Sequence, residues 1–222
     1  CMVRSKSRLD PLLQEKTDVV EADVFDPDSL KPCLKEIDVA YYMIHSMGSR
    51  KGEFERMDRK AALTFGTICR TENVKRIIYL GGLGAKEDEL SEHLKSRQET
   101  GEVLRRSGVP VTEFRAGSIV GAGSLSFEMV RYLVERLPVL ICPRWVNGIT
   151  QPISIRDVLK FLVMCLELPE SSGRIFEIGG SDKLSYLDMM KTYARIRELK
   201  RLFINVPVLT PKLSSLWLGL VT

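Results

Sequence analysis

Two short apolar runs flank a long amphipathic stretch between residues 74 and 123. The runs are Val74–Leu80 and Val111–Arg115, and each is followed by small residues of the kind that end strands. Between them, Glu89–Ser107 repeats apolar residues at steps of three and four, as a helix packed on a sheet does. Gly108 suits the end of that helix. A strand, a helix and a second strand in this order predict a βαβ unit with parallel strands.

The same alternation continues toward the N-terminus. Strands are expected at Cys1–Val3, Thr17–Ala22 and Asp38–Ile44, and helices at Asp10–Glu15, Asp26–Leu34 and Glu53–Arg70. The run Asp38–Ile44 is mostly apolar, which is typical of a parallel strand buried on both faces. Right-handed crossovers between such strands place helices on both sides of the sheet. The residues up to Gly123 therefore predict a doubly wound α/β fold.

The pattern changes after Gly123. Strands are expected at Val139–Cys142, Ile149–Ile155, Arg174–Ile178 and Arg201–Val206, and helices at Phe127–Leu137, at Arg156–Leu168 and after Ser185, which forms a capping box with Asp188. We expect residues 124–222 to form a smaller lobe wrapped onto the sheet. Both ends of the chain look cut. The first residues resemble a strand already under way, and a helical pattern after Thr210 reaches the last residue without a cap.

Composition excludes several classes of function. Apolar residues make up 44% and charged residues 28% of the chain, and the net charge of +4 is spread rather than blocked. This pattern favours an ordinary solvated surface over a nucleic-acid face. The 5 cysteines form no metal-ligand cluster, and Cys69 and Cys165 lie in apolar helical patterns as small buried residues. No run is long enough to span a membrane, and we expect a cytoplasmic protein without metal.

Polar or glycine-bearing residues follow each successive predicted strand. They are Arg4, Asp23, His45–Met47, Gly81–Gly82 and Arg115–Ser118. Ligands of doubly wound sheets bind just outside the carboxyl ends of the strands. Taken singly, each of these residues fits ordinary turn chemistry equally well or better. Taken together, they predict one ligand-binding edge of one sheet.

The helix Glu89–Ser107 carries two unusual residues. Its sheet-facing stripe contains Arg97 and Gly101 among leucines, and His93 lies one turn before Arg97. A guanidinium on that side needs an anion or several carbonyl groups, and a ligand phosphate, ribose or carboxylate would serve. Alternatively, Arg97 reaches the rim and pairs with a glutamate of its own helix. Periodicity favours these two interpretations equally, and His93 alone is more often a structural histidine.

Three pieces of the chain resemble a known family. They are YYMIHSMG, then HLKSRQETGEVLRRSGVPVTEFRAGSIVGAGS, and LPVLICPRWV with the following Gln151-Pro152-Ile153. The chain resembles atypical, extended-like short-chain dehydrogenase/reductases of the NmrA-like, NAD(P)H-binding kind, within them a bacterial group with an additional C-terminal domain. The resemblance implies a Rossmann-like parallel sheet, a partial dinucleotide-binding domain over residues 1–123, and a small substrate lobe over residues 124–222.

The resemblance also assigns cofactor contacts. Arg4 matches the position that selects NADP(H) over NAD(H), and Asp23 with Val24 matches the adenine contact. The remaining matched residues, which line the cofactor or lie beside its nicotinamide, are Ile44, His45, Ser46, Gly81, Gly82, Arg97, Arg115, Ala116, Gly117 and Ser118. The implied partners are a dinucleotide and an unknown small molecule.

The chain departs from the family pattern in two ways. No GxxGxxG phosphate loop occurs, so the first strand and its glycine loop are expected to be missing. The usual Tyr-x-x-x-Lys pair falls on His93 and Arg97, and the usual serine or threonine falls on Gly81 or Gly82. Histidine can act as an acid or base near neutral pH, and arginine can hold the ribose.

Three hypotheses remain open from the sequence. The first is a reductase or epimerase-like enzyme acting on a small carbonyl or sugar-type substrate. The second is a non-catalytic NADP(H)-binding sensor or assembly factor. The third is a membrane-surface or protein-interaction role of the apolar C-terminal segment, which the sequence favours least. The substrate and the oligomeric state are left open.

Overall fold

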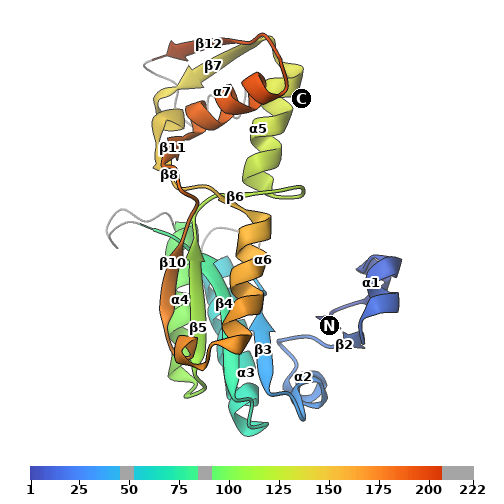
Figure 1. The fold of residues 1–222 in the computed structure, drawn as a ribbon. Coiled ribbons are helices and arrows are strands. Elements are labelled where there is room, and N and C mark those ends of the chain that lie inside the picture. The colour runs from blue at the N-terminus through green and yellow to red at the C-terminus, as the bar shows by residue number, and fades with distance from the viewer. Residues whose placement is uncertain (46–52, 85–91, 207–222) are drawn as a thin grey trace. The chain divides into compact units, whose positions relative to one another are not determined.

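The computed structural model describes residues 1–45, 53–84 and 92–206. The chain divides into two compact units (Figure 1). One contains residues 1–115 and 162–177, and the other contains residues 116–161 and 178–222. The expected division into domains after Gly123 stays a prediction. No helix in the described ranges is both long enough and apolar enough to cross a membrane.

The first unit is built on a four-stranded sheet. Its strands are β3 (Val39–Tyr42), β4 (Arg76–Gly82), β5 (Val111–Ala116) and β10 (Ile175–Ile178), in the order β10-β5-β4-β3. Strands β3 and β4 run parallel, in a register that pairs Val39 with Arg76 and Tyr42 with Tyr79. Aliphatic and β-branched residues dominate β4 and β5, and most of their side chains are buried. The parallel strands expected from the βαβ pattern are present.

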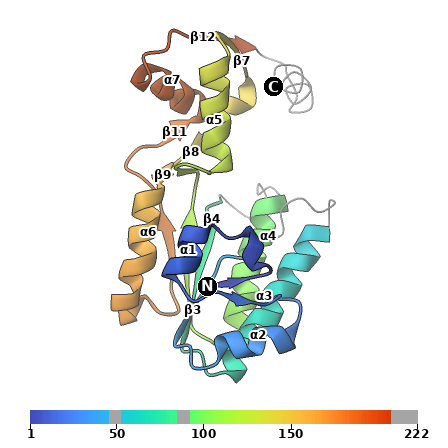
Figure 2. The same ribbon diagram turned by 90° about the vertical axis from the view of Figure 1, so that its right-hand side faces the viewer.

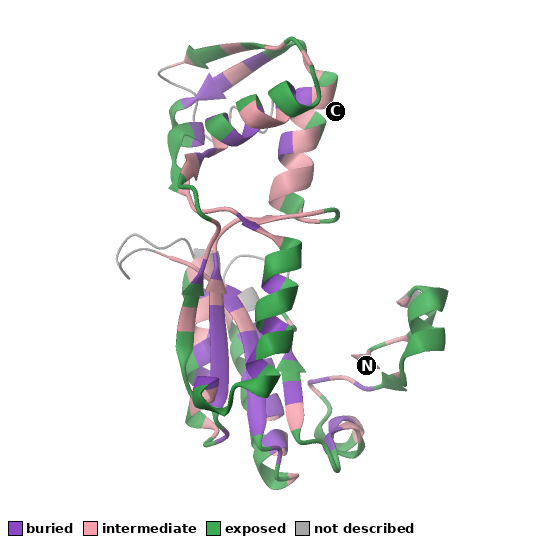
Figure 3. Cartoon of the chain, in the orientation of Figure 1, coloured by how far each residue is buried: buried purple, intermediate pink, exposed green. Residues whose placement is uncertain are grey.

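Three helices belong to one face of this sheet: α2 (Pro27–Leu34), α3 (Glu53–Thr71) and α4 (Glu92–Arg106). Figure 2 shows α3 and α4 side by side, and the two helices pack closely. Their apolar stripes meet the strands in a single core that includes Tyr42, Phe65, Ile77 and Leu104. The Tyr42 and Phe65 rings meet edge to face, with centroids 5.0 Å apart. Figure 3 shows that most of β4 is buried, whereas β3 alternates between buried and more exposed residues.

The opposite face of the sheet binds the segment 162–177 through a buried arginine. Arg76 of β4 is only 7% exposed. Its guanidinium donates to the Thr112 hydroxyl at 2.8 Å, to the Cys165 carbonyl at 2.6 Å and to the Ser171 hydroxyl. Thr112 in turn donates to the Ser171 carbonyl. A guanidinium with five donors tolerates burial when several acceptors surround it, so Arg76 fastens this segment to the sheet.

Replacing Arg76 by methionine is expected to lower the free energy of unfolding by about 2–3 kcal/mol, because buried acceptors lose their donor. Arg76→Lys should restore only part of the loss, since an ammonium cannot span three acceptors. Urea unfolding measures both. Lys75 is the matched control, because its ion pair with Asp38 is exposed, and Lys75→Met should change stability by less than about 1 kcal/mol. Equal effects of the two methionine variants would contradict this role of Arg76.

The N-terminal residues form a parallel pair of their own. Strand β1 (Met2–Val3) pairs with β2 (Val20–Glu21). Between them lie a short 3₁₀ helix, η1 (Lys6–Arg8), and α1 (Pro11–Lys16), which Asp10 caps. In a Rossmann sheet the strand order is 3-2-1-4-5-6. The pair β2-β1 and the series β5-β4-β3 are two separate sets of paired strands among the described residues.

The second unit contains α5 (Leu125–Arg136), α7 (Tyr186–Ile196) and three pairs of short strands. The pairs are β6 (Ile119–Val120) with β9 (Ile153–Ser154), β7 (Val139–Pro143) with β12 (Leu202–Val206), and β8 (Ile149–Thr150) with β11 (Leu184–Ser185), while β5 and β10 extend one residue each from the first unit. Ser185 and Asp188 form the predicted capping box at the start of α7. The core of this unit includes Val134, Leu140 and Met190.

The expected strand over Ile149–Ile155 is wrong as a single element. It is two short strands, β8 and β9, which join different partners. Pro152 lies between them and has no backbone N–H to give to a ladder. The expected helix after it begins at Ile155 as α6 (Ile155–Met164) and continues as two 3₁₀ turns, η4 (Cys165–Glu167) and η5 (Pro169–Ser171).

Candidate dinucleotide site

The carboxyl ends of β4 and β5 carry two guanidinium groups in the first unit. Arg97 of α4 is half-buried, and its Nη2 donates to the Leu80 carbonyl at 2.7 Å. Arg115 lies near the end of β5, and its side chain is 19% exposed. The glutamates once considered as partners of Arg97 are engaged elsewhere, Glu99 with Arg59 and Glu102 with Arg106. The Arg97 side chain therefore reaches the sheet edge, as the ligand interpretation requires.

Two buried tyrosines lie beside Arg97. The Tyr79 hydroxyl donates to the Arg97 carbonyl at 2.8 Å. Burial raises the pKa of Tyr79 to about 12, although the nearby Arg97 opposes the rise. Burial also raises the pKa of Tyr42, and the Asp58 carboxylate adds to that effect. Both phenols therefore stay protonated near neutral pH, and neither takes the place of an acid–base tyrosine.

A buried glutamate holds Arg115. Glu113 of β5 is 0% exposed. Its Oε1 accepts a hydrogen bond from Arg115 Nε at 2.7 Å, and its Oε2 accepts one from Arg105 Nη1 of α4. Glu113 and Arg115 are two residues apart on one strand, so both side chains are on the same face of the sheet. We refer to Glu113, Arg105 and Arg115 as the Glu113 triad.

Glycines at two positions leave room for this carboxylate. A Cβ at Gly101 of α4 would lie 2.5 Å from Glu113 Oε2, and a Cβ at Gly81 would lie 3.4 Å from Oε1. Gly101 thus lets α4 pack closely against Glu113 of β5. The same contacts give a structural reason for glycine at position 81. Gly81 is one of the two residues that match the usual serine or threonine of the family, and it borders the Glu113 carboxylate.

Gly101→Ala is expected to destabilise the protein by about 1–3 kcal/mol, because the added methyl group collides with a buried carboxylate. The usual effect in a helix has the opposite sign, since alanine favours helix formation by about 1 kcal/mol over glycine. Thermal and urea unfolding measure the change. Lys95→Ala, at an exposed position of α4, is the control and should change little. A more stable Gly101→Ala variant would show that the Glu113 carboxylate moves aside freely.

The predicted adenine-side residues have structural roles of their own. Asp23 Oδ1 accepts from the Phe25 N–H at 2.9 Å, and the Ser29 hydroxyl donates to the Asp23 carbonyl. This turn starts α2. Val24 is buried in the core, whereas Arg4 is exposed just after β1. Any contact of Val24 with a ligand would therefore be through its backbone.

The other expected residues are distributed as follows. Ile44 packs against the core of the first unit, and His45 is exposed. A Cβ at Gly82 would meet the Leu94 side chain at 2.7 Å. Ser46 and the side chain of His93 lie outside the described residues, although the backbone of His93 belongs to α4.

The segment after β5 belongs to the second unit. Ala116 is buried. A Cβ at Gly117 would lie 2.9 Å from the Gln151 carbonyl oxygen, so this position requires a residue without a side chain. The hydroxyl groups of Ser118 and Tyr186 are 3.3 Å apart. Gly117, which was expected to lie beside the cofactor, therefore also allows the backbone of Gln151 to pack closely against it.

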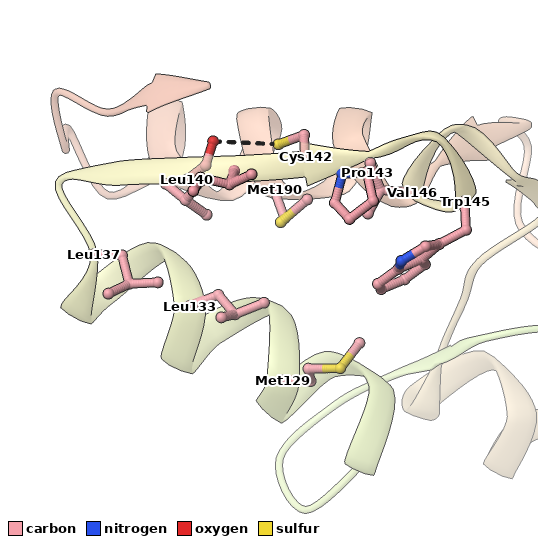
Figure 4. Close-up of a pocket in the computed structure, with 10 residues that line it drawn as sticks. Met129, Leu133, Leu137, Leu140, Cys142, Pro143, Trp145, Val146 and Met190 are labelled. Atoms are coloured by element: carbon pink, nitrogen blue, oxygen red, sulfur yellow. Dashed lines mark hydrogen bonds between the residues drawn. The ribbon is translucent and has the colours of Figure 1, made fainter. Parts of the chain in front are cut away.

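The second unit also contains an apolar groove between α5 and β7 (Figure 4). Its lining consists of Met129, Leu133, Leu137, Leu140, Ile141, Cys142, Pro143, Trp145, Val146 and Met190. The space between these residues is about 450 Å³, counted out to the open mouth. None of the lining side chains is charged, so the groove suits an apolar group rather than a phosphate.

Sequence reasoning missed Glu113, Tyr42 and Tyr79 as members of this region. The available signal was the Glu-x-Arg pair in an otherwise apolar strand, because two charges on one buried face need partners. Gly101 on the facing helix was the second half of that signal. The link between them is a contact across two elements, which strand and helix periodicity does not reveal.

Residues 1–129 match the model of a protein family described as NAD(P)H-binding. The chain belongs to this NAD(P)H-binding family. The resemblance inferred from the motifs is therefore confirmed, and so is dinucleotide binding as the property of the family. The match covers β1 to β5 and the helices between them, which is the part that carries Arg97 and Arg115.

A curated relative and two solved structures extend this result. The photosystem II assembly factor Ycf39 of Trieres chinensis is 23% identical over 181 residues, which is 81% of this chain and 55% of that protein. The chain thus spans little more than half the length of this relative.

Both solved structures have the same fold. A nucleoside-diphosphate-sugar epimerase from Staphylococcus aureus is 16% identical, with a TM-score of 0.76 over 97% of this chain and 73% of that one. The triphenylmethane reductase of Citrobacter sp. complexed with NADP(H) is 14% identical, with a TM-score of 0.76 over 99% and 73%. These likenesses confirm the predicted Rossmann-like α/β fold.

Proposed function

We propose that this protein binds NADP(H) at the carboxyl ends of β3, β4 and β5 and uses it in a reduction or epimerase-like reaction on a small carbonyl or sugar-type substrate. The observation that supports this proposal best is the inward reach of Arg97, whose Nη2 lies 2.7 Å from the Leu80 carbonyl oxygen at the end of β4. A cation in that place suits the ribose and phosphate groups of a dinucleotide.

The preference for NADP(H) over NAD(H) rests on Arg4. It follows β1 directly and is exposed. An arginine after the second strand of a Rossmann sheet accommodates the 2′-phosphate of NADP(H). The solved reductase of this fold that holds NADP(H) is consistent with this preference.

The pyrophosphate of a dinucleotide is normally held by backbone N–H groups of a glycine-rich loop at the N-terminus of a helix. No GxxGxxG occurs in this sequence, and the chain spans 55% of the length of the curated relative. Binding experiments should therefore use the full-length protein.

Within this proposal, His93 and Arg97 take the place of the tyrosine and lysine of the family. When bound, the dinucleotide supplies or accepts a hydride. Arg97 holds the ribose, and His93, one helical turn earlier on α4, exchanges a proton with the reacting oxygen.

A non-catalytic NADP(H)-binding role is the second candidate. Gly81 and Gly82 provide no hydroxyl at the end of β4, so one donor to a substrate carbonyl is lacking. A relative of this chain is an assembly factor. This candidate predicts tight NADPH binding without turnover on any substrate.

Arg97→Met is expected to raise the dissociation constant for NADPH at least tenfold, because a charge-assisted contact is lost. Fluorescence titration or calorimetry with NADPH measures the effect. Lys95→Met on the exposed side of the same helix is the matched control and should bind like the wild type. Unchanged NADPH affinity in Arg97→Met would remove the main support for the proposed site.

A further inference from the structure

The Glu113 triad is an unusual feature for the interior of a sheet protein. A carboxylate that is 0% exposed lies between two guanidinium groups. Burying three charges costs much of what their attraction returns, so a well-packed apolar trio of similar volume would be about as stable. Stability alone therefore does not explain the triad. A role in fixing one side chain in one orientation explains it better.

The side chain that the triad fixes is Arg115. Glu113 Oε1 receives its hydrogen bond from Nε, the inner nitrogen of the Arg115 guanidinium, at 2.7 Å. This hydrogen bond restricts the orientation of the guanidinium plane, and it uses neither of the two outer nitrogens, Nη1 and Nη2. Arg115 is the last residue but one of β5, at the same carboxyl-terminal side of the sheet as Leu80 of β4, to which Arg97 donates.

The rest of the triad anchors Glu113 itself. Arg105 in the last turn of α4 binds the other carboxylate oxygen. Gly81 and Gly101 border the carboxylate from β4 and α4, where any side chain would approach it. The carboxylate is thus held by side chains from α4 and β5 without any ligand.

We propose that Glu113 is a positioning residue for dinucleotide binding, acting through Arg115. It holds the Arg115 guanidinium in its binding orientation before the ligand arrives, which reduces the side-chain conformational entropy lost on binding. This inference rests on the proposed function, because it takes Arg115 as part of the cofactor site. It adds a residue that does not touch the cofactor, and a physical reason for the glycines on either side of it.

The test is a double-mutant cycle on NADPH affinity in the full-length protein. Arg115→Met should raise the dissociation constant at least tenfold, and Glu113→Gln about threefold to tenfold. The double variant should bind no more weakly than Arg115→Met alone, since Glu113 acts only through Arg115. Arg106→Met is the matched control, because Arg106 lies next to Arg105 on the exposed side of α4 and pairs with Glu102; it should bind like the wild type.

Each other outcome has a definite meaning. Normal affinity in Glu113→Gln or in Arg115→Met overturns the positioning role, and so do additive losses in the double variant, which would indicate a general structural effect. If Glu113→Gln does not fold, Glu113→Asp keeps the charge and shortens the reach; its affinity for NADPH must fall, and adding Glu113→Asp to Arg115→Met must cause no further loss. Failure of the wild type to bind NADPH overturns the proposed function itself, which separates that result from failure of the positioning role.

Discussion

Glu113→Leu is expected to lower the free energy of unfolding by about 3–5 kcal/mol. The leucine fills much of the same space, so the loss comes from charge rather than from a cavity. Arg105 and Arg115 are 28% and 19% exposed in their side chains, and without Glu113 both guanidiniums keep the cost of partial burial without a counter-charge. Urea unfolding followed by circular dichroism measures the change.

A second replacement tests the cause of that loss. In the double variant Glu113→Leu with Arg105→Leu, one of the two uncompensated charges is removed. Stability should then recover by at least about 1 kcal/mol relative to Glu113→Leu alone, because an apolar pair can replace a buried ion pair at small cost. If the double variant is instead less stable than both single variants, the triad stabilises the fold through packing rather than through charge compensation.

His93→Ala is expected to lower the rate of any NADPH-dependent turnover by about 10²–10⁴-fold. The reason is that proton transfer to the reacting oxygen loses its donor, while Arg97 still holds the dinucleotide. NADPH affinity should therefore stay within about twofold of the wild type. The measurement is NADPH oxidation across a panel of small carbonyl compounds, followed for both proteins under identical conditions.

The outcome separates the two candidate functions. Turnover that survives in His93→Ala would contradict an acid–base role for this histidine. No turnover in the wild type on any compound, together with tight NADPH binding, would favour the non-catalytic role. His93→Gln is a useful companion, because it keeps a polar side chain of similar size but cannot exchange a proton near neutral pH.

Much of the fold follows from local pattern. The β4–α4–β5 unit was expected from two apolar runs around an amphipathic stretch, and it is present within a few residues of the expected limits. Gly108 ends α4 with a φ of +86°, a conformation that glycine adopts without strain. The capping box at Ser185 and the burial of Cys69 and Cys165 also follow from residue type and position.

Other features depend on contacts between distant parts of the chain. The Glu113 triad joins β5 to α4, and the Arg76 network joins β4 to residues 165 and 171. A charged residue inside an apolar strand signals that a partner exists but not which one. Pro152 was a local signal that the strand is interrupted, but the apolar residues on both sides of it suggested one continuous strand.

The candidate site was predicted only in part. The strand-end rule singled out Arg115, which lies near the carboxyl end of β5, and helix periodicity singled out Arg97, which donates to the Leu80 carbonyl. It did not anticipate that Asp23 is used in the turn that starts α2, or that Gly117 is required by the nearby Gln151 carbonyl. Both residues stabilise or permit a particular backbone arrangement, and the sequence alone does not distinguish this structural role from contact with a ligand.

The central claim is that this protein binds NADP(H) at the carboxyl ends of its parallel strands. Its most direct test is calorimetric titration of the full-length protein with NADPH and, separately, with NADH. The account predicts saturable one-to-one binding of NADPH, weaker binding of NADH, and loss of that difference in Arg4→Ala. Absence of binding to both dinucleotides would contradict the claim.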